Sequence, residues 1–322
     1  ELIDISFYID VEESLKNRWK ISRDSRKRGY SINQIVKTIE KRKKDEEKFI
    51  KTQRELCDVI LKFRMTPEGK ISLSFEYDNK ELAWLINKIK KLYHLLEEFI
   101  HVSDKISNNI DLCQDKGGNL SFKFDNTIVI TESGSSFDQI SYFEGFGFYD
   151  LNGKSIFEDQ RRPSMEIDAH LRLGACCLHV HPLHALAILC SRECNSIFSH
   201  LDIDGEVINY SPPGKETADN IKAHKNVFLK NHGIFISRDS MIEAFEDSVK
   251  IDNLCKNYLL NLSGHQEYLY PDAFVLLEEN RFYQSYIKDL LRSSGLTANL
   301  LSKEDVRVLS GMEEEKYRRS LK

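Results

Sequence analysis

Apolar residues recur at helical spacing in several long stretches of the chain, and they alternate or cluster in shorter stretches between them. Residues 81–102 are the clearest case, because their apolar positions form one stripe and predict a long amphipathic helix. The same spacing predicts helices over residues 11–19, 31–49, 165–173, 184–190, 241–260 and 274–291. Short apolar runs predict strands over residues 4–10, 57–63, 120–124, 127–131, 175–181, 226–229 and 234–236. This alternation of strands and helices predicts an α/β fold, arranged as an α/β/α sandwich.

Polar residues mark the ends of some of these elements. Ser31 precedes a helical pattern and is a candidate N-cap, since its side chain can accept a hydrogen bond from the first turn. Asp125 and Asn126 separate two short strand patterns and predict a tight hairpin turn.

The composition is that of a globular protein. The 322 residues are 41% hydrophobic and 30% charged, which excludes a disordered chain and allows one large domain or two. No run approaches the roughly 20 apolar residues that span a bilayer, so no membrane partner is expected. The first residues lack the features of a signal peptide, and seven cysteines in a long chain favour reduced thiols in the cytoplasm. The chain opens without Met, which is consistent with a fragment of a longer protein.

Charge is distributed unevenly along the chain. Residues 1–70 have a net charge of +5, whereas the remainder has −10. Together with the turn residues Thr66-Pro-Glu-Gly69, this step predicts three segments: residues 1–66, a linker at 67–80, and a domain at 81–322. Acidic residues interleave with the basic ones in the first segment, so a solvated surface is expected there and no nucleic-acid partner.

Histidine is concentrated in one region, since seven of the ten histidines lie between His170 and His232. His179 and His181 are two residues apart in a predicted strand, so their imidazoles point to the same face. Two neutral imidazoles that converge in this way form half of a zinc-type site.

Two further residues complete a candidate metal site. His232 follows a short apolar strand and precedes a glycine, and a turn there would hold its imidazole at a sheet edge. Glu166 opens a predicted helix just ahead of the histidine pair, where it could be a fourth ligand or a general base. Taken singly, these residues are as well explained by capping or by the helix dipole. Together they favour a metal site.

Two loops of small residues precede the candidate metal residues. Residues 117–121 (Gly-Gly-Asn-Leu-Ser) and 131–136 (Thr-Glu-Ser-Gly-Ser-Ser) place Gly beside a hydroxyl or amide. Backbone N–H groups in such loops can bind an anion, although either loop alone is more simply a turn.

In this order along the chain, the segments resemble the class II aldolase/adducin-head family, which includes the fuculose-1-phosphate and rhamnulose-1-phosphate aldolases. The resemblance covers roughly residues 85–322, with a tail near Leu300–Tyr317 similar to the rhamnulose branch. It is carried by Gly118-Asn119-x-Ser121, Thr131-x-Ser133-Gly134, Pro163-Ser164-Met165-Glu166, His179-x-His181-Pro182, Tyr210-Ser-Pro-Pro-Gly214 and Asn231-His232-Gly233.

The resemblance implies a fold, a cofactor and roles for site residues. It implies an α/β/α sandwich of the class II aldolase type, a Zn²⁺ or other divalent ion as cofactor, and a homotetramer. The ion would be held by His179, His181 and His232, with Glu166 as the catalytic acid/base. The substrate phosphate would be held by Gly118, Asn119, Ser133, Gly134 and Ser164.

The implied reaction is reversible cleavage of a phosphorylated ketose into dihydroxyacetone phosphate and an aldehyde. Glutamate at position 166 is similar to the aldolase branch, because the related pentulose-phosphate 4-epimerases tend to have aspartate there. Met165 replaces a serine of the fuculose-type enzymes, which also carry a tyrosine in a loop after the metal strand. The corresponding loop is expected at residues 192–202, and it contains no tyrosine. Two alternatives stay open: a sugar-phosphate epimerase or dehydratase at the same metal site, and a binding module without activity, as in the adducin heads.

The N-terminal residues resemble the C-terminal part of the phosphoribulokinase/uridine kinase family. The similar residues include Arg23-Asp24, Arg28-Gly29-Tyr30 and Asp58-Val59-Ile60. In that family the Arg-Asp and Arg-Gly residues belong to a lid, so Arg23 and Arg28 would contact phosphates. No Gly-x-x-x-x-Gly-Lys-Ser/Thr loop occurs in the chain, so this segment alone cannot bind a nucleoside triphosphate as a kinase does. We therefore expect a longer protein in which a kinase precedes an aldolase-like domain. A helical appendage used only for packing is the alternative.

Overall fold

The structure is a computed structural model that describes most of the chain. The described residues are 4–67, 71–113, 117–140, 144–158, 161–222, 225–263 and 280–299, with 302, 304 and 308. They form two compact units, Glu1–His94 and Leu95–Lys322, which divide within helix α3 (Ala83–Ser107). Among these residues, none of the helices has the length and apolar character required to cross a bilayer.

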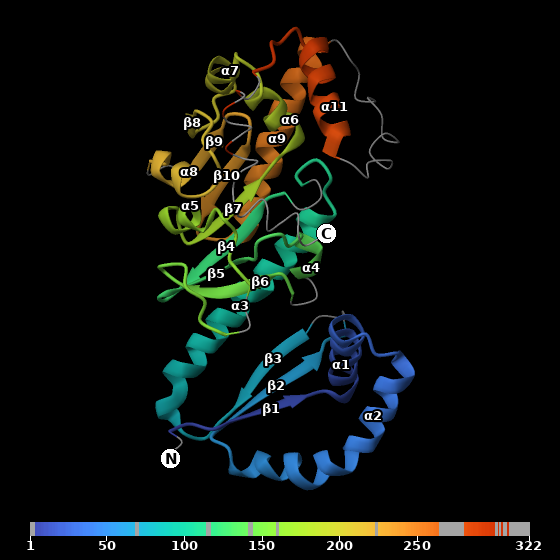
Figure 1. The fold of residues 1–322 in the computed structure, drawn as a ribbon. Coiled ribbons are helices and arrows are strands. Elements are labelled where there is room, and N and C mark those ends of the chain that lie inside the picture. Colours follow the sequence, from blue (N-terminus) through green and yellow to red (C-terminus); the bar gives the residue numbers. More distant parts are fainter. Residues whose placement is uncertain are drawn as a thin grey trace. The chain divides into compact units, whose positions relative to one another are not determined.

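The first unit contains a three-stranded sheet in the order β1-β2-β3 (Figure 1). β1 pairs with β2 in parallel, and β3 pairs with β2 antiparallel. The helices α1 and α2 connect β1 to β2. The strands are β1 Phe7–Val11, β2 Val59–Met65 and β3 Ile71–Glu76, and the helices are α1 Glu13–Arg28 and α2 Ile32–Asp45. Short helical turns at Glu46–Ile50 and Lys51–Leu56 follow α2.

Local signals explain this unit. Ser31 caps α2 as expected, and Gln34 completes a capping box with it. Alternate residues of β2 face α3, so Val59 packs with Leu82 and Ile86 in a buried cluster. Strand β3 occupies much of the segment predicted as a linker at 67–80, and its exposure alternates as a strand with one buried face requires. The predicted boundaries of the three segments, at residues 66, 67–80 and 81, stay a prediction.

The second unit is built on a seven-stranded sheet in the order β6-β5-β4-β7-β10-β9-β8. All neighbours pair antiparallel except β8 and β9, which are parallel. The strands are β4 Asn119–Phe124, β5 Thr127–Thr131, β6 Phe146–Asp150, β7 Cys176–Val180, β8 Glu206–Ile208, β9 Asn226–Leu229 and β10 Gly233–Arg238. The helices beyond α3 are α4 Phe137–Ile140, α5 Ile167–Arg172, α6 Leu183–Leu189, α7 Cys194–His200, α8 Lys215–Asn220, α9 Met241–Ser263 and α11 Asn280–Ser293.

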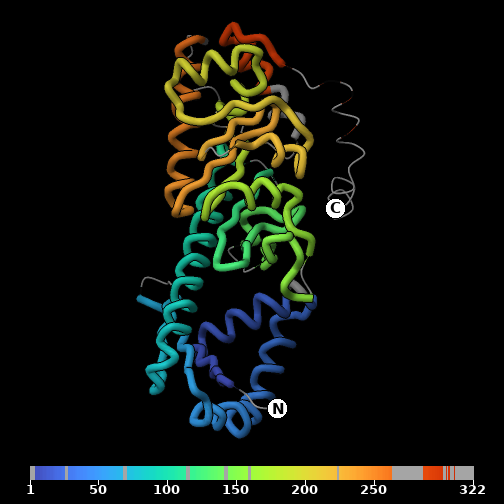
Figure 2. Tube along the Cα trace, turned by 90° about the vertical axis from the view of Figure 1, so that its left-hand side faces the viewer, coloured from blue at the N-terminus to red at the C-terminus, as the bar shows by residue number. Residues whose placement is uncertain are grey.

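Helices cover both faces of this sheet, which confirms the predicted α/β/α arrangement (Figures 1 and 2). On one face, Phe99 of α3 meets Phe122 of β4, and α9 packs along β7 and β10. On the other face, residues of α5 and α8 form a buried cluster with alternate residues of β7, β9 and β10. The site described below lies on the α5 face.

Most predicted elements are present, with small differences at their ends. The hairpin turn is confirmed, since Phe124 pairs with Thr127 and Asp125 has a φ of 52°. The predicted helix at 274–291 begins at Asn280 where it is described, and the resemblance of Leu300–Tyr317 falls almost wholly outside the described residues. Residues 192–202, expected to be a loop, contain helix α7.

Candidate active site

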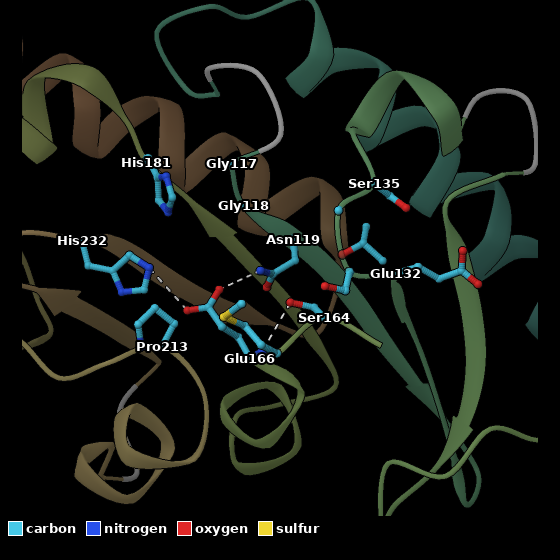
Figure 3. Close-up of a pocket in the computed structure, with 14 residues that line it drawn as sticks. Gly117, Gly118, Asn119, Glu132, Ser135, Ser164, Glu166, His181, Pro213 and His232 are labelled. Atoms are coloured by element: carbon cyan, nitrogen blue, oxygen red, sulfur yellow. Dashed lines mark hydrogen bonds and ion pairs between the residues drawn. The ribbon is translucent and has the colours of Figure 1, made fainter. Parts of the chain in front are cut away.

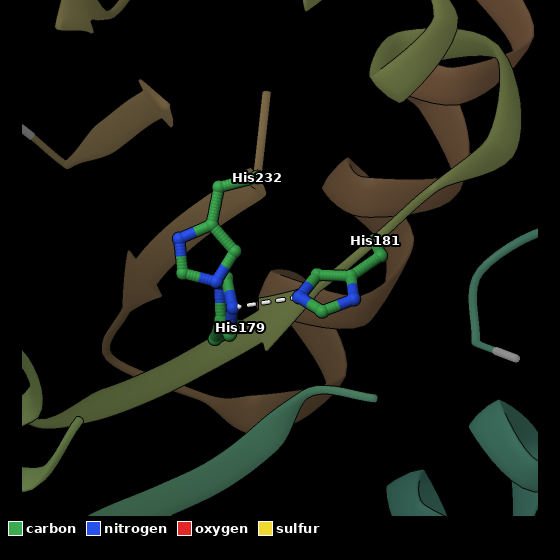
Figure 4. A group of neighbouring side chains, drawn as sticks. All are labelled: His179, His181 and His232. Atoms are coloured by element: carbon green, nitrogen blue, oxygen red, sulfur yellow. Dashed lines mark hydrogen bonds between the residues drawn. The ribbon is translucent and has the colours of Figure 1, made fainter. Parts of the chain in front are cut away.

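Three imidazoles meet beside the end of β7, although one of them is distant in sequence (Figure 4). His179 lies in β7 and His181 directly follows it, while His232 lies in the turn between β9 and β10. Because β10 pairs with β7, with Phe235 opposite His179, the turn before β10 comes close to the end of β7. One ring nitrogen from each histidine lies within 4.8 Å of the others, and the Nε2 atoms of His179 and His181 are 3.0 Å apart.

The surroundings of His179 determine which nitrogen faces the cluster. Its Nδ1 lies 2.9 Å from the carbonyl oxygen of Ile234, and a carbonyl can only accept, so Nδ1 carries the proton. Burial lowers the pKa of His179 well below its ordinary value, so the ring is neutral. The lone pair on Nε2 therefore points toward the other histidines, as a metal ligand requires.

Glu166 is the carboxylate of the site. It precedes α5, is only 4% exposed, and accepts a hydrogen bond from Asn119 Nδ2 at 2.7 Å through Oε2 (Figure 3). The same oxygen lies 3.2 Å from His179 Nε2, and Oε1 lies 3.5 Å from His232 Nε2. Within the described part of the chain, Oε1 of Glu166 and Nδ1 of His232 have no hydrogen-bond partner.

These contacts fit a bound cation. His179 Nε2 and Glu166 Oε2 both present lone pairs, and two such atoms at 3.2 Å repel each other unless a positive charge lies between or beside them. Two more imidazoles complete a donor set of neutral nitrogens and one carboxylate, which suits Zn²⁺. The structure brings the four predicted residues together, and their roles as ligands and as acid/base stay a prediction.

A pocket adjoins this cluster, and all five residues predicted to hold phosphate line it. Ser133 and Ser135 each have a buried hydroxyl with no hydrogen-bond partner among the residues that the structure describes. Unsatisfied buried hydroxyls are costly unless a ligand pairs with them. The lining residues are Gly117, Gly118, Asn119, Thr131, Glu132, Ser133, Gly134, Ser135, Ser164, Met165, Glu166, His181, Pro213 and His232.

Gly118 is required by the geometry of the pocket loop. Its φ is +88°, and a Cβ there would lie 2.5 Å from the carbonyl oxygen of His179. Only glycine therefore lets the loop before β4 pass this close to β7.

We expect Gly118→Ala to lower the free energy of unfolding by about 3 kcal/mol, because it adds a clash with backbone to a left-handed conformation. Gly295→Ala is the matched control, since its φ is +68° but nothing lies within 4 Å of an added Cβ. It should cost only about 1 kcal/mol. Urea unfolding of both variants measures the difference, and equal losses would contradict the role of the close approach.

Some residues of the site were not singled out from the sequence. Ser135 shares the loop of Ser133, and only the burial of its hydroxyl distinguishes it. His170 lies four residues after Glu166, which places both on one side of α5, and this spacing was the available signal. Residues 192–202 offer Phe198, which is buried, and His200, whose ring lies 5.8 Å from that of Tyr258.

A second group of possible ligands, Asp111, His184 and Asp252, has a structural explanation. Asp252 Oδ1 accepts the backbone N–H groups of His184 and Ala185 at 2.9 Å, and Oδ2 lies 2.8 Å from His184 Nδ1. The carboxylate thus caps the start of α6 and orients His184. Both of its oxygens are already engaged.

In the first unit, the two predicted phosphate-binding arginines contact a buried carboxylate. Asp24 is 4% exposed, and its Oδ1 lies 2.8 Å from Arg23 Nε and 3.3 Å from Arg28 Nη1. Both guanidinium groups remain about half exposed. Whether they contact phosphate stays a prediction.

Comparison with known proteins divides the chain into two regions. Residues 1–71 match the Phosphoribulokinase / Uridine kinase family, and residues 97–259 match the Class II Aldolase and Adducin N-terminal domain. Chloroplastic phosphoribulokinase from Spinacia oleracea is 38% identical over 77 residues, which are 22% of this chain and 19% of that protein. The chain thus spans about a fifth of the length of the phosphoribulokinases that it matches.

The second region has relatives of a different kind. L-fuculose phosphate aldolase from Methanococcus maripaludis is 26% identical over 186 residues, which are 49% of this chain and 98% of that protein. The structure of an N-terminal class II aldolase domain from Thermoplasma acidophilum aligns with a TM-score of 0.46 at 20% identity, covering 51% of this chain and 93% of that one. Because the matched region is half of the chain, this protein belongs to the class II aldolase and adducin N-terminal domain family, and its N-terminal segment matches the phosphoribulokinase/uridine kinase family.

Proposed function

We propose that the chain is a divalent-metal-dependent aldolase that reversibly cleaves a phosphorylated ketose into dihydroxyacetone phosphate and an aldehyde. The observation that carries the proposal is the convergence of three imidazole nitrogens and a buried carboxylate beside a hydroxyl-lined pocket. Family membership and the relative named as L-fuculose phosphate aldolase support this choice of reaction.

His179, His181 and His232 would hold the ion, and their neutral rings would leave its charge undiminished. When bound, a Zn²⁺ or similar ion supplies Lewis-acid stabilisation of negative charge on substrate oxygens. The hydrogen bond from His179 to the carbonyl of Ile234 orients its ring before any ion arrives.

Glu166 would transfer the protons of the reaction. Cleavage removes a hydroxyl proton, breaks the C3–C4 bond to release the aldehyde, and leaves its electron pair as an enediolate that takes up a proton. A buried carboxylate with one oxygen free of hydrogen bonds among the described residues can accept and return such a proton.

The hydroxyl-lined part of the pocket would hold the substrate phosphate. Ser133, Ser135 and the backbone around Gly118 and Gly134 can donate to phosphate oxygens without a full positive charge. Asn119 would contribute through its backbone or its second amide hydrogen, because its side-chain oxygen and one hydrogen are engaged with His170 and Glu166. The phosphate would act as a handle that orients the carbon chain.

We expect Ser133→Ala to raise the KM for a phosphorylated ketose by roughly tenfold, the value of one hydrogen bond to a charged group. The KM for the same ketose without phosphate should change little. Ser136→Ala is the matched control, because that hydroxyl donates to Asp138 and does not line the pocket. Equal effects on both substrates would argue against a phosphate contact.

The proposed function is tested by incubating the metal-loaded chain with a panel of ketose 1-phosphates. Dihydroxyacetone phosphate would be measured by its reduction with NADH in a coupled assay. Triose formation with at least one substrate supports the proposal. Epimerised or dehydrated sugar without triose favours the alternative chemistry, and a chain that binds no divalent ion favours a binding module.

We further propose that residues 1–66 form part of a kinase-type unit joined through residues 67–80 to the aldolase-like domain at 81–322. The match to about a fifth of phosphoribulokinase supports the first assignment. The coding sequence upstream of Glu1 tests it. A phosphate-binding loop of the Gly-x-x-x-x-Gly-Lys-Ser/Thr type there would support the fusion, and an upstream stop codon would defeat it.

A further inference from the structure

A chain of hydrogen bonds connects Glu166 to the sheet beneath it. Glu166 Oε2 lies 2.7 Å from Asn119 Nδ2, Asn119 Oδ1 contacts His170 Nε2, and His170 Nδ1 lies 2.7 Å from Ser121 Oγ. All four side chains are at least 95% buried. Their pairwise contacts therefore have no competition from bulk water.

The backbone explains why these side chains meet. Asn119 and Ser121 are two residues apart in β4 and face the same side of the sheet, and Glu166 and His170 are four residues apart at the start of α5. The two pairs face each other, and the His170 ring also packs edge-on against Phe235 at 5.6 Å. Three hydrogen bonds between β4 and the start of α5, and one ring contact with β10, hold the arrangement.

Only one direction of donation satisfies every member. The carboxylate of Glu166 accepts, so Asn119 turns its NH₂ toward Glu166 and its oxygen toward His170. His170 must then donate through Nε2–H and accept through Nδ1 from the hydroxyl of Ser121. Burial lowers the pKa of His170 to about 4, so the ring is neutral and carries the single proton that this arrangement needs.

The same series of hydrogen bonds gives the two oxygens of Glu166 different surroundings. Oε2 receives the hydrogen bond from Asn119, whereas Oε1 faces His232 Nε2 at 3.5 Å and accepts no hydrogen bond from the residues described. If Asn119 were flipped, its oxygen would face Oε2, and the carboxylate could rotate. The direction of these hydrogen bonds thus decides which oxygen of Glu166 is available to exchange a proton.

We propose that His170 is a positioning residue, whose Nε2–H tautomer fixes Asn119 and thereby keeps Oε1 of Glu166 as the oxygen that exchanges protons. The role of Oε1 rests on the proposed function, whereas the tautomer and the orientation of Asn119 do not. Ser121 takes part by stabilising the unprotonated Nδ1.

The tautomer is tested directly by ¹⁵N NMR of the full chain labelled at histidine, in its metal-free form. We expect His170 to show a protonated Nε2 and an unprotonated Nδ1 in wild type, assigned by comparison with His170→Gln. A protonated Nδ1 would overturn the proposal. This measurement needs no turnover, so it decides the inference even if the aldolase assignment fails.

Two variants separate positioning from packing. His170→Gln can donate and accept in nearly the same places, whereas His170→Leu fills the space but can do neither. We expect His170→Leu to lower kcat by roughly 10- to 100-fold with little change in KM or in bound metal. His170→Gln should stay within a few-fold of wild type.

A merely structural role predicts a different pattern, in which activity follows the melting temperature. Equal kcat values for His170→Leu and wild type, or equal losses in the Leu and Gln variants, would refute the proposal. If His170→Leu does not fold, Ser121→Ala replaces it, because that variant removes only the hydroxyl donor to Nδ1. It should lower kcat below that of wild type and raise the fraction of protonated Nδ1 in the NMR spectrum.

Discussion

His232→Ala should deprive the purified protein of its tightly bound divalent ion and lower turnover by roughly a thousandfold. Loss of one of three imidazoles weakens the site, and the reaction would lose several kcal/mol of Lewis-acid stabilisation. His232 is the best of the three for this test. Its side chain is 12% exposed, and its Nδ1 has no hydrogen-bond partner among the described residues, so little of the fold depends on it.

His179 would give a less clear answer. It is fully buried, hydrogen-bonded to Ile234 and stacked on Phe235, so its replacement would also destabilise the sheet. His101→Ala is the matched control for His232→Ala, because His101 is exposed on α3 and belongs to neither group of possible ligands found among the described residues. Metal content by mass spectrometry and kcat measure the effect. Full metal content in His232→Ala, at the affinity of wild type, would contradict the proposed site.

Glu166→Gln should lower kcat by roughly 10²- to 10⁴-fold while the protein still binds its ion through the three histidines. Glutamine keeps the shape of the side chain and can still accept the hydrogen bond from Asn119. It cannot exchange a proton as a carboxylate does. The expected result is therefore a loss in kcat with a smaller change in KM.

Asp168→Asn provides the comparison for Glu166→Gln. Asp168 lies two residues further along, in the first turn of α5, and its side chain is exposed. It should have nearly wild-type activity, which separates the loss of a negative charge near α5 from the loss of the acid/base. Turnover of Glu166→Gln within tenfold of wild type would show that another group moves the proton.

Hydrophobic patterning predicted much of the fold but missed elements whose pattern is short or unusual. Strand β8 has three residues, and β6 has the sequence Phe-Gly-Phe-Tyr-Asp, whose consecutive aromatic residues leave no clear period of two. Strand β3 does alternate, but it lies between turn residues and was assigned to a linker. Helix α7 lies where the resemblance implied a loop.

The amino-acid sequence by itself determined which chemical groups are available and which of them are neighbours along one element. His179 and His181 share a face because strands have a period of two, and Glu166 directly precedes the helical pattern that becomes α5. The family, too, was recognisable from six short motifs in a fixed order.

Only the tertiary structure decided which distant groups meet. The order β4-β7-β10 places Asn119 opposite His179 and brings the turn of His232 to the end of the same strand. Pairing between strands far apart in sequence is set by packing of the whole sheet, so no local pattern reveals it. The polarity of the contacts among Ser121, His170 and Asn119 is likewise absent from the sequence, because it follows from burial and from what each neighbour can donate.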